Sequence, residues 1–336
     1  MHPLKYRLAS IAVGLALLGA QPALAAGAEP VTLAVPALSF SFTMEFVAQD
    51  LGLFAKEGLA VKEVDIAGLG AINSLISGSS DFALASGASL TRAAAHGQRL
   101  LDIAALSDRS FGQIVLRKTL AEQAGFDPHA PLAKRAQVLK GRTIGVDSIN
   151  ALNDVYLRLV ARAGGIDPDS MRIAVIAPPS LPAAFASKQI DGFSMTPPWP
   201  QQPLLDGTAV LVASGPDGDP SNLVPLINSV LLTRHDVCEK RPSICEKMGH
   251  AYAAAAEVIR DHPDQAIAVL EKRFPTLNAK TVEAAFAVLR KITPVPPAPT
   301  LDGIRNNETF NVMAGLLKPD QALKSFDDLF TDKYVR

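Results

Sequence analysis

The sequence predicts an α/β protein built from two lobes, each with its own mainly parallel sheet. Three observations predict this architecture. Short apolar strands alternate with helical segments four times between Val31 and Leu106, the alternation begins again at Arg142, and the chain from about residue 241 onward is helical. Strands that alternate with helices form right-handed βαβ units, whose parallel sheets carry helices on both faces.

The N-terminal segment has the pattern of a cleaved export signal. Lys5 and Arg7 precede the apolar run Leu8–Ala20, and the small residues Ala23–Ala25 follow. The run is shorter than the roughly 20 residues that span a bilayer, and no cysteine follows the expected cleavage site as a lipid anchor would require. We expect residues 1–25 to be a signal peptide and the mature chain to be soluble outside the cytoplasm. A buried N-terminal helix is the alternative, but the segment has no amphipathic pattern.

The first block of alternation begins with Val31–Val35, an apolar segment that ends at Pro36 and is predicted as a buried strand. Thr43–Leu51 follows, with apolar residues at the spacing of an amphipathic helix. The remaining elements of the block are expected to be strand Leu59–Ile66, helix Ala71–Ile76, strand Phe82–Ala85, helix Leu90–His96 and strand Leu101–Leu106.

A charged stretch that contains Pro128 and Pro131 interrupts the pattern before the second block. That block is expected to contain strand Arg142–Val146, helix Asn153–Ala163, strand Ile173–Ile176, helix Leu181–Ser187 and strand Ile190–Ser194. The C-terminal helices are expected at Ser243–Arg260, Pro263–Arg273 and Ala279–Ile292, with a tail from Leu301. No third sheet is predicted, so these helices should pack on the two lobes.

Composition limits the partners that the chain can bind. The formal net charge of −1 becomes about −3 once the segment with Lys5 and Arg7 is removed. No concentrated basic face is visible, which argues against nucleic acid and anionic membranes and favours a small molecule. The two cysteines, Cys238 and Cys245, would form one disulfide in an oxidising compartment, with two free thiols as the alternative. The histidines are scattered, so no metal site is expected.

Motifs for nucleotide binding and hydrolysis are incomplete. Gly68–Asn73 has the first two glycines of a dinucleotide-binding loop, but Asn73 stands in place of the third. Gly87–Thr91 lacks the last glycine of a nucleophile elbow, and no phosphate-binding Walker loop occurs. We therefore predict no catalytic residue, no cofactor and no enzymatic activity.

Polar and aromatic segments follow several of the predicted strands, at the ends where ligands bind in open α/β sheets and helix N-termini present free N–H groups. Two such lobes would enclose a small molecule between them. The predicted ligand-binding residues are Phe40, Ser41, Phe42, Thr43, Leu69, Gly70, Ser86, Gly87, Arg109, Ser148, Asn150, Thr196 and Trp199. Alternative roles are helix capping for the hydroxyls, core packing for the phenylalanines, a hinge ion pair for Arg109 and interlobe packing for Trp199.

Several segments together resemble the nitrate/sulfonate/taurine-type periplasmic substrate-binding proteins of ABC importers, the NMT1/THI5-like proteins. The segments that carry the resemblance, in order, are Gly52–Leu59, Asn73–Asp81, Leu139–Val146, Gly165–Pro168, Lys188–Gly192, Pro198–Trp199 and Arg260–Asp264. Their order and spacing extend over nearly all of the mature chain.

The resemblance implies a bilobal type II periplasmic-binding-protein fold, with a central ligand cleft and with the C-terminal helices packed on the first lobe. Lobe I would comprise residues 26–116 and 228–336, and lobe II residues 117–227. The chain would cross between the lobes near Val115–Lys118 and near Leu226–Leu231. The implied function is a monomeric periplasmic component that delivers a small-molecule solute to an ABC permease in the inner membrane, driven by a cytoplasmic ATPase.

The predicted solute is a small organic anion, a sulfonate or carboxylate with an apolar body. Helix N-termini and few acids near the strand ends favour an anion or a neutral aromatic over a cation. Two other functions fit the same fold. One is an extracellular ligand sensor for a signalling partner, and the other is a thiamin-pyrimidine-precursor synthase, whose cysteine-rich motif has no counterpart here.

Overall fold

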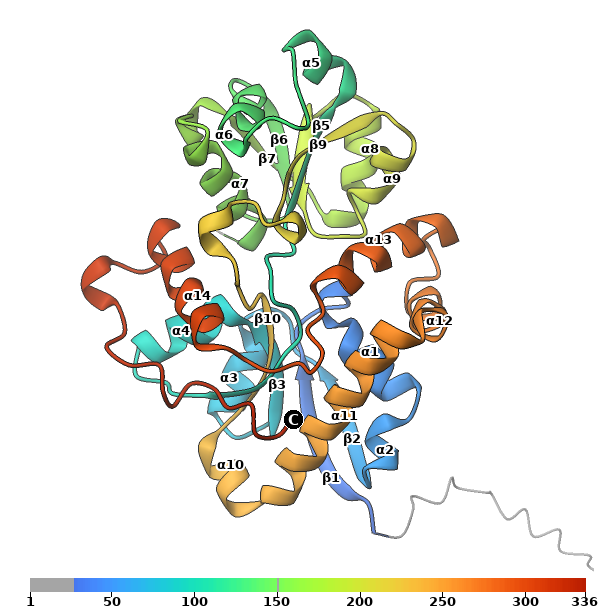
Figure 1. Cartoon of the computed structure of the whole chain (residues 1–336), viewed down its shortest axis with the longest axis vertical. Coiled ribbons are helices and arrows are strands. Elements are labelled where there is room, and N and C mark those ends of the chain that lie inside the picture. Colours follow the sequence, from blue (N-terminus) through green and yellow to red (C-terminus); the bar gives the residue numbers. More distant parts are fainter. Residues whose placement is uncertain (1–26, 150) are drawn as a thin grey trace, which may run out of the picture.

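The computed structural model describes residues 27–149 and 151–336, which form two lobes that each contain a five-stranded sheet (Figure 1). The predicted signal peptide lies outside the described residues. The first sheet has the strand order β2-β1-β3-β10-β4 and the second the order β7-β6-β8-β5-β9. The bounds of the first sheet are β1 Glu29–Val35, β2 Leu59–Asp65, β3 Phe82–Ser86, β4 Leu101–Ala105 and β10 Ser229–Thr233. Those of the second are β5 Gln113–Arg117, β6 Thr143–Val146, β7 Arg172–Val175, β8 Gly192–Met195 and β9 Ala209–Ser214.

Both sheets are built by the same rule. In the first, β1 pairs in parallel with β2 and β3, while β10 runs antiparallel between β3 and β4. In the second, β6 pairs in parallel with β7 and β8, while β5 runs antiparallel between β8 and β9. The predicted α/β fold of two mainly parallel sheets is confirmed, with one reversed strand in each.

The reversed strands determine where the chain passes between the lobes. The first crossing was expected near Val115–Lys118, but Val115 lies within β5 and pairs with Phe193 of the second sheet. The chain therefore crosses between Ala105 and Gln113 and returns between Ser214 and Ser229. We accordingly propose lobe boundaries within these two crossing segments, the first of them earlier than residue 116. The strands β5, β9 and β10 were not predicted as strands.

The first lobe carries both N-terminal and C-terminal helices. Its helices are α1 Thr43–Asp50, α2 Leu53–Lys56, α3 Gly70–Ile76, α4 Gly87–Ala95, α10 His235–Lys240, α11 Pro242–Asp261, α12 Pro263–Arg273, α13 Ala279–Ile292 and α14 Leu301–Met313. The long helix α11 packs on α1 and α2 and buries Met248, Tyr252 and Ile259 in the largest apolar core. The predicted C-terminal helices are confirmed, and their packing on the first lobe follows from these contacts.

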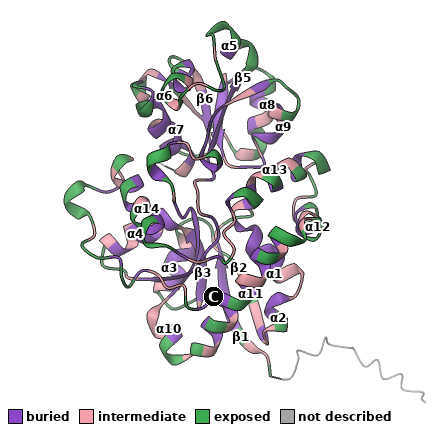
Figure 2. Ribbon diagram, viewed as in Figure 1, coloured by how far each residue is buried: buried purple, intermediate pink, exposed green. Residues whose placement is uncertain are grey.

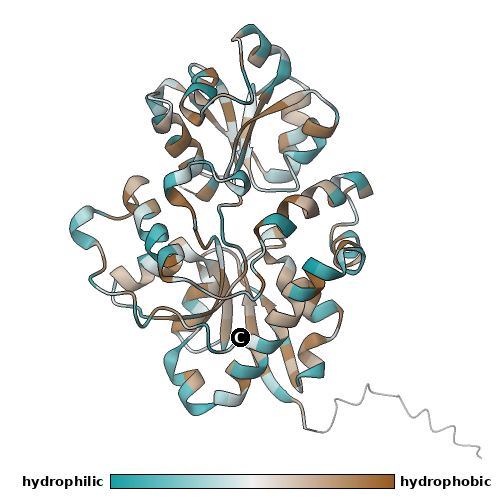
Figure 3. Cartoon of the chain, in the orientation of Figure 1, coloured by the Kyte–Doolittle hydropathy of each residue, from teal (hydrophilic) through white to brown (hydrophobic). Residues whose placement is uncertain are grey.

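The second lobe is smaller. Its helices are α5 Lys118–Gln123, α6 Leu132–Arg135, α7 Leu152–Ala163, α8 Leu181–Ala186 and α9 Gln201–Leu205, together with a 3₁₀ turn at Ala136–Leu139. Burial is concentrated on the inner strands β5, β6 and β8 and on the helix faces against them, whereas the edge strand β7 has no buried residue (Figure 2). Hydrophobic stretches lie on these inner strands and on parts of the helices (Figure 3). Apolar strands without alternation are expected where helices cover both faces of a sheet.

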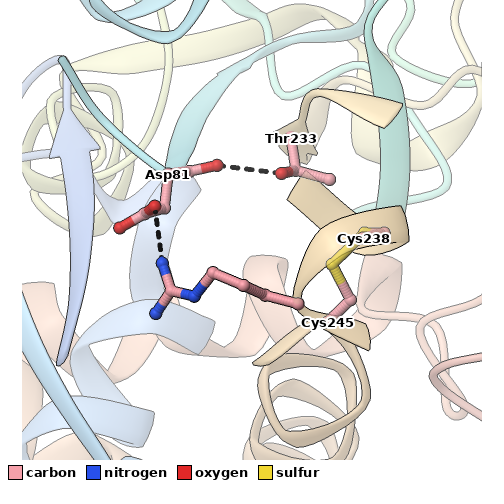
Figure 4. The surroundings of a disulfide bond; sticks show 5 residues. Asp81, Thr233, Cys238 and Cys245 are labelled. Atoms are coloured by element: carbon pink, nitrogen blue, oxygen red, sulfur yellow. Dashed lines mark hydrogen bonds and ion pairs between the residues drawn. A yellow bond between two sulfur atoms is a disulfide. The ribbon is translucent and has the colours of Figure 1, made fainter. Parts of the chain in front are cut away.

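A disulfide joins Cys238 at the end of α10 to Cys245 in the first turns of α11, with the two Cα atoms 5.6 Å apart (Figure 4). Pro242 begins α11 between them. Beside the bridge, the Asp81 carboxylate accepts a hydrogen bond from Arg241 at 3.0 Å, and the backbone carbonyl of Asp81 accepts one from the Thr233 hydroxyl at 2.8 Å. These contacts and the disulfide hold the segment between β10 and α11 against the start of β3.

Candidate functional site: a cleft between the lobes

A cavity of about 450 Å³ lies between the lobes, at the ends of strands from both sheets. Cavities of this size accommodate small organic ligands. The first lobe lines it with Pro36, Ala37, Leu38, Ser39, Ser41, Phe42, Gly68, Ala85, Ser86, Asn228, Ser229 and Phe274. The second lobe lines it with Asp147, Leu152, Asn153, Pro178, Pro179, Met195, Thr196, Pro197, Pro198 and Trp199.

The wall from the first lobe begins with a 3₁₀ turn after β1, Phe40–Phe42. The Ser39 hydroxyl caps this turn by accepting a hydrogen bond from the backbone N–H of Ser41 at 3.2 Å. Phe42 lines the cavity, whereas Phe40 is fully buried behind it, with its ring centroid 4.7 Å from that of Phe274. Phe274 follows α12 and reaches the cavity from a distant part of the sequence.

A second part of this wall is the start of α4. The Ser86 side chain caps the helix, accepting from the backbone N–H of Ser89 at 3.1 Å. A Cβ atom on Gly87 would lie 2.2 Å from the backbone oxygen of Ile227, in the second crossing segment. Only glycine permits this approach without displacement, because real Cβ contacts do not come that close. The helix start is thus held directly against the crossing segment.

The opposite wall comes from three segments of the second lobe: the end of β8 with the loop after it, the chain after β6 that supplies Asp147 and Asn153, and the pair Pro178 and Pro179. After β8, the chain forms the loop Thr196–Pro200, with a cis bond between Pro197 and Pro198. Trp199 in this loop is partly buried and packs against the apolar cluster that contains Phe193 and Met195. The ring therefore has a fixed packing surface on one side while it contributes to the cavity lining.

The polar part of this wall is formed by Asp147 and Asn153. The Asn153 side-chain nitrogen donates to an Asp147 carboxylate oxygen at 3.0 Å and to the Met195 sulfur at 3.3 Å. Asn153 is only 4% exposed, and its side-chain oxygen has no hydrogen-bond partner in the described part of the chain. Asp147 is the one ionisable side chain among the described lining residues.

Comparison with known proteins places this architecture in a family. The family model described as "NMT1/THI5 like" matches residues 39–266, which is well over half of the chain. The chain belongs to the NMT1/THI5-like family. A relative from Brucella abortus, named "Putative binding protein", is 26% identical over 234 residues, and the alignment spans 67% of this chain and 66% of that protein.

Solved structures share the fold of this NMT1/THI5-like chain. A protein from Bordetella bronchiseptica RB50 superposes with a TM-score of 0.74 at 18% identity, covering 91% of this chain and 96% of the other. The periplasmic aliphatic sulphonate-binding protein SsuA from Escherichia coli gives 0.66 at 17% identity, covering 90% of each. The periplasmic nitrate-binding protein NrtA from Synechocystis PCC 6803 gives 0.63 at 15%, covering 90% and 86%. The predicted periplasmic-binding-protein fold is confirmed.

Five of the residues predicted to bind ligand line the cavity of this NMT1/THI5-like protein: Ser41, Phe42, Ser86, Thr196 and Trp199. The others lie elsewhere. Phe40 is core, and the Thr43 hydroxyl donates to the Phe40 carbonyl at 2.7 Å. Leu69 is 61% exposed beside the lining residue Gly68, and Gly70 begins α3 where a Cβ would meet Ile66 at 2.7 Å.

The remaining predicted residues also lie away from the cavity or outside the description. Ser148 is exposed, and Asn150 lies outside the described residues. Gly87 lies against the crossing segment. Arg109, in the first crossing segment, donates to the Pro216 carbonyl at 3.2 Å and lies 3.9 Å from the Asp108 carboxylate. It therefore connects the two crossings, the hinge role that the sequence left open for it.

Sequence reasoning missed several lining residues for identifiable reasons. Asn228 and Ser229 belong to the end of a crossing segment and the start of β10, which was not predicted as a strand. Pro178 and Pro179 were treated as a plain loop. Phe274 follows a C-terminal helix, and nothing local indicates that this helix returns to the cleft. Asp147 belongs to the polar segment after β6 that the sequence pointed to, but Ser148 and Asn150 were chosen from it as the ligand-binding residues. Asn153 was assigned only to the helix that follows.

An acidic cluster lies behind the aromatic wall. Glu45 in α1 is fully buried and neither of its carboxyl oxygens has a partner in the described part of the chain. Burial, together with the neighbouring Glu63, raises the pKa of Glu45 well above its usual range. Arg273 crosses the cluster, at 2.7 Å from Asp50 and 3.5 Å from Glu63, with its guanidinium 4.9 Å from the centre of the Phe46 ring. It thereby fixes the end of α12, from which Phe274 enters the cleft.

The described residues contain neither a metal-binding cluster nor a helix that could span a membrane. No cluster of three or more His, Cys, Asp or Glu side chains with metal-binding geometry occurs among residues 27–149 and 151–336. In the same part of the chain, no helix is long and apolar enough to span a bilayer.

Proposed function

We propose that this protein is the periplasmic solute-binding component of an ABC importer. It binds a small organic solute in the cleft and delivers it unchanged to a permease in the inner membrane, whose ATPase lies in the cytoplasm. The observation that carries the proposal is the 450 Å³ cavity lined by strand-end segments of both lobes. A site divided between two lobes gains all of its contacts only when the lobes close.

The crossing segments supply the mechanism. Two connections allow the lobes to move as bodies about a hinge, and a ligand that contacts both lobes stabilises the closed arrangement. Closure is supported by contacts outside the cavity. The Gln202 side-chain oxygen of the second lobe accepts from the Asn278 amide at 2.6 Å and from the Thr281 hydroxyl at 2.7 Å. Lys291 of α13 also pairs with Asp217 in the second crossing.

Location and partners are part of the proposal. The predicted signal peptide supports export, and the Cys238–Cys245 disulfide fits an oxidising compartment. The permease partner is supported by a fold relative from Staphylococcus aureus that is the ligand-binding component of an ABC-type import system. The periplasmic location is supported by the fold relatives SsuA and NrtA, which are periplasmic binding proteins. We propose that the protein does not catalyse a reaction, because the family relatives are named as binding proteins. We also propose a monomer, the state that the resemblance implied.

The apolar part of the solute is supported by the aromatic rings of Phe42, Phe274 and Trp199, which line opposite walls of the cleft. Flat apolar groups bind well between aromatic faces. For the polar part, the position of two helix starts, those of α4 and α7, beside the cavity is the observation in favour of the organic anion predicted from the sequence. The side-chain charges of the lining do not favour an anion.

A metabolite-capture experiment tests the function. The mature protein, incubated with a cell metabolite extract and washed, should retain a small molecule that native mass spectrometry detects and that denaturation releases unaltered. Addition of that compound at 100 times its dissociation constant should stabilise the fold by about 2.7 kcal/mol. Release of a chemically altered compound, or no retained compound from any extract, would contradict the proposal.

A further inference from the structure

We infer that the cleft binds a solute without negative charge whose polar end donates hydrogen bonds, such as an amine, amidine or amide attached to an aromatic body. The inference rests on the proposed function, because it concerns the solute of the same cleft. It differs from the organic anion that the sequence favoured, and the reason is the distribution of charges and acceptors around the cavity.

The cavity offers a negative charge and no positive side chain. None of its described lining residues is Lys, Arg or His, and Asp147 is the single ionisable one. Arg109, the cation expected here, is engaged by the Pro216 carbonyl in the crossing segments. Arg273, next to the lining residue Phe274, already pairs with Asp50 and Glu63. An anionic solute would meet a carboxylate of its own sign and no counter-charge.

The second lobe presents two acceptors next to one another. One oxygen of Asp147 accepts from the Asn153 amide, and the other has no partner among the described residues. The Asn153 oxygen is buried and lacks a donor. A buried carbonyl without a donor is unfavourable, so a ligand that supplies a donor recovers this cost. A solute with two N–H groups at one end matches the pair.

The helix starts contribute less to anion binding than their position suggests. At the 3₁₀ turn Phe40–Phe42 and at α4, the capping residues Ser39 and Ser86 already accept hydrogen bonds from backbone N–H groups that an anion would use. At α7, Asp147 precedes the helix, while Asp154 in its first turn pairs with Arg158 at 3.0 Å. Fixed carboxylates near a helix N-terminus offset the positive end of its dipole. The remaining free amides would have to outweigh Asp147 for an anion to bind.

The aromatic walls fit the same class of solute. Trp199 lies on one side of the cavity, with Phe42 and Phe274 on the other. The negative faces of such rings attract cations and polarised N–H groups. Both parts of the solute therefore find a matching surface: the aromatic rings contact its apolar body, and the oxygens of Asp147 and Asn153 accept from its N–H groups.

Calorimetric titration with four single-ring probes of similar shape tests the inference: benzamidine, benzamide, benzoate and benzenesulfonate. We expect benzamidine to bind at least about tenfold more tightly than either anion, the ratio that corresponds to ~1.4 kcal/mol. In Asp147→Asn the affinity for benzamidine should fall by about tenfold or more, with a smaller loss for benzamide. Asp264→Asn, the same substitution at an exposed site in the first lobe, should leave all affinities unchanged.

Tighter binding of benzoate or benzenesulfonate would overturn the inference, as would an unchanged benzamidine affinity in Asp147→Asn or failure of all four probes to bind. The metabolite-capture experiment separates this failure from failure of the proposed function. A captured anion would refute the inference and leave the transport proposal standing. A captured compound with N–H donors and no negative charge would support both, and the absence of any captured compound would count against both.

Discussion

Replacement of Gly87 by alanine tests how closely the first lobe is held against the second crossing segment. The new methyl group would lie 2.2 Å from the Ile227 backbone oxygen and 2.4 Å from the Asn307 amide nitrogen. Neither atom can move freely, because the Asn307 amide donates to that same Ile227 oxygen at 2.9 Å and to the Gly303 carbonyl at 3.0 Å. The substitution must therefore displace backbone.

The magnitude follows from two costs. Inserting a methyl group into a packed interior costs about 1–3 kcal/mol. If the Asn307 hydrogen bond to Ile227 is broken, the buried carbonyl loses a donor at a further cost of roughly 1–3 kcal/mol. We expect Gly87→Ala to lower the free energy of unfolding by about 2–6 kcal/mol, measured by urea denaturation followed by circular dichroism.

The matched control is Gly97→Ala, just beyond the end of α4. A Cβ atom there meets nothing within 4 Å, but the residue has a φ of +83°. Only backbone strain opposes this substitution, at about 1–2 kcal/mol. If Gly87→Ala is no more destabilising than Gly97→Ala, the close contact between α4 and the crossing segment does not exist in solution and the reasoning fails.

Three further predictions concern the buried acid, the aromatic wall and the interlobe contact. Because the pKa of Glu45 is raised in the folded state, the free energy of unfolding should fall as pH rises from about 4.5 through that folded pKa. Glu45→Gln should reduce this fall, measured by urea denaturation at a series of pH values. The same dependence of stability on pH in the variant would refute the prediction. Trp199→Ala should weaken solute binding about tenfold or more in calorimetry without unfolding the protein, whereas Ser148→Ala should not; equal affinities would exclude Trp199 from the site. Gln202→Ala removes two hydrogen bonds between the lobes, worth about 1 kcal/mol each, so it should favour an open arrangement with a larger radius of gyration in X-ray scattering. The exposed substitution Gln189→Ala should leave the scattering unchanged, and identical curves for both variants would contradict the role of Gln202.

The fold could be predicted where the signal is local. The apolar runs at Val31–Val35 and Phe82–Ala85 and the helical spacing in 279–292 are strong patterns within short windows, and the structure has strands and a helix there. The antiparallel strands β5 and β10 could not be identified in the same way. Each of these strands follows a crossing and pairs in a different sheet from the strand that precedes it in the sequence. Its identity therefore depends on pairing with residues far along the chain.

The candidate site shows the same division. Ser41, Ser86 and Trp199 directly follow predicted strands or lie in the loop after one, and they line the cavity. Phe274 reaches the cleft because α12 is fixed by the ion pairs of Arg273, an arrangement that local spacing does not reveal. The expected anion depended on counting acids and helix starts along the sequence. That count gave no information on which of the charges would share a cavity.

The reversed strand in each sheet also constrains the order in which the two sheets can be completed during synthesis. All five strands of the second lobe lie between Gln113 and Ser214, so its sheet can form as soon as that stretch is available. In the first lobe, β4 is joined to β3 only through β10, which emerges later. The first-lobe sheet therefore stays incomplete until β10 has been synthesised, which happens only after all five strands of the second lobe are available.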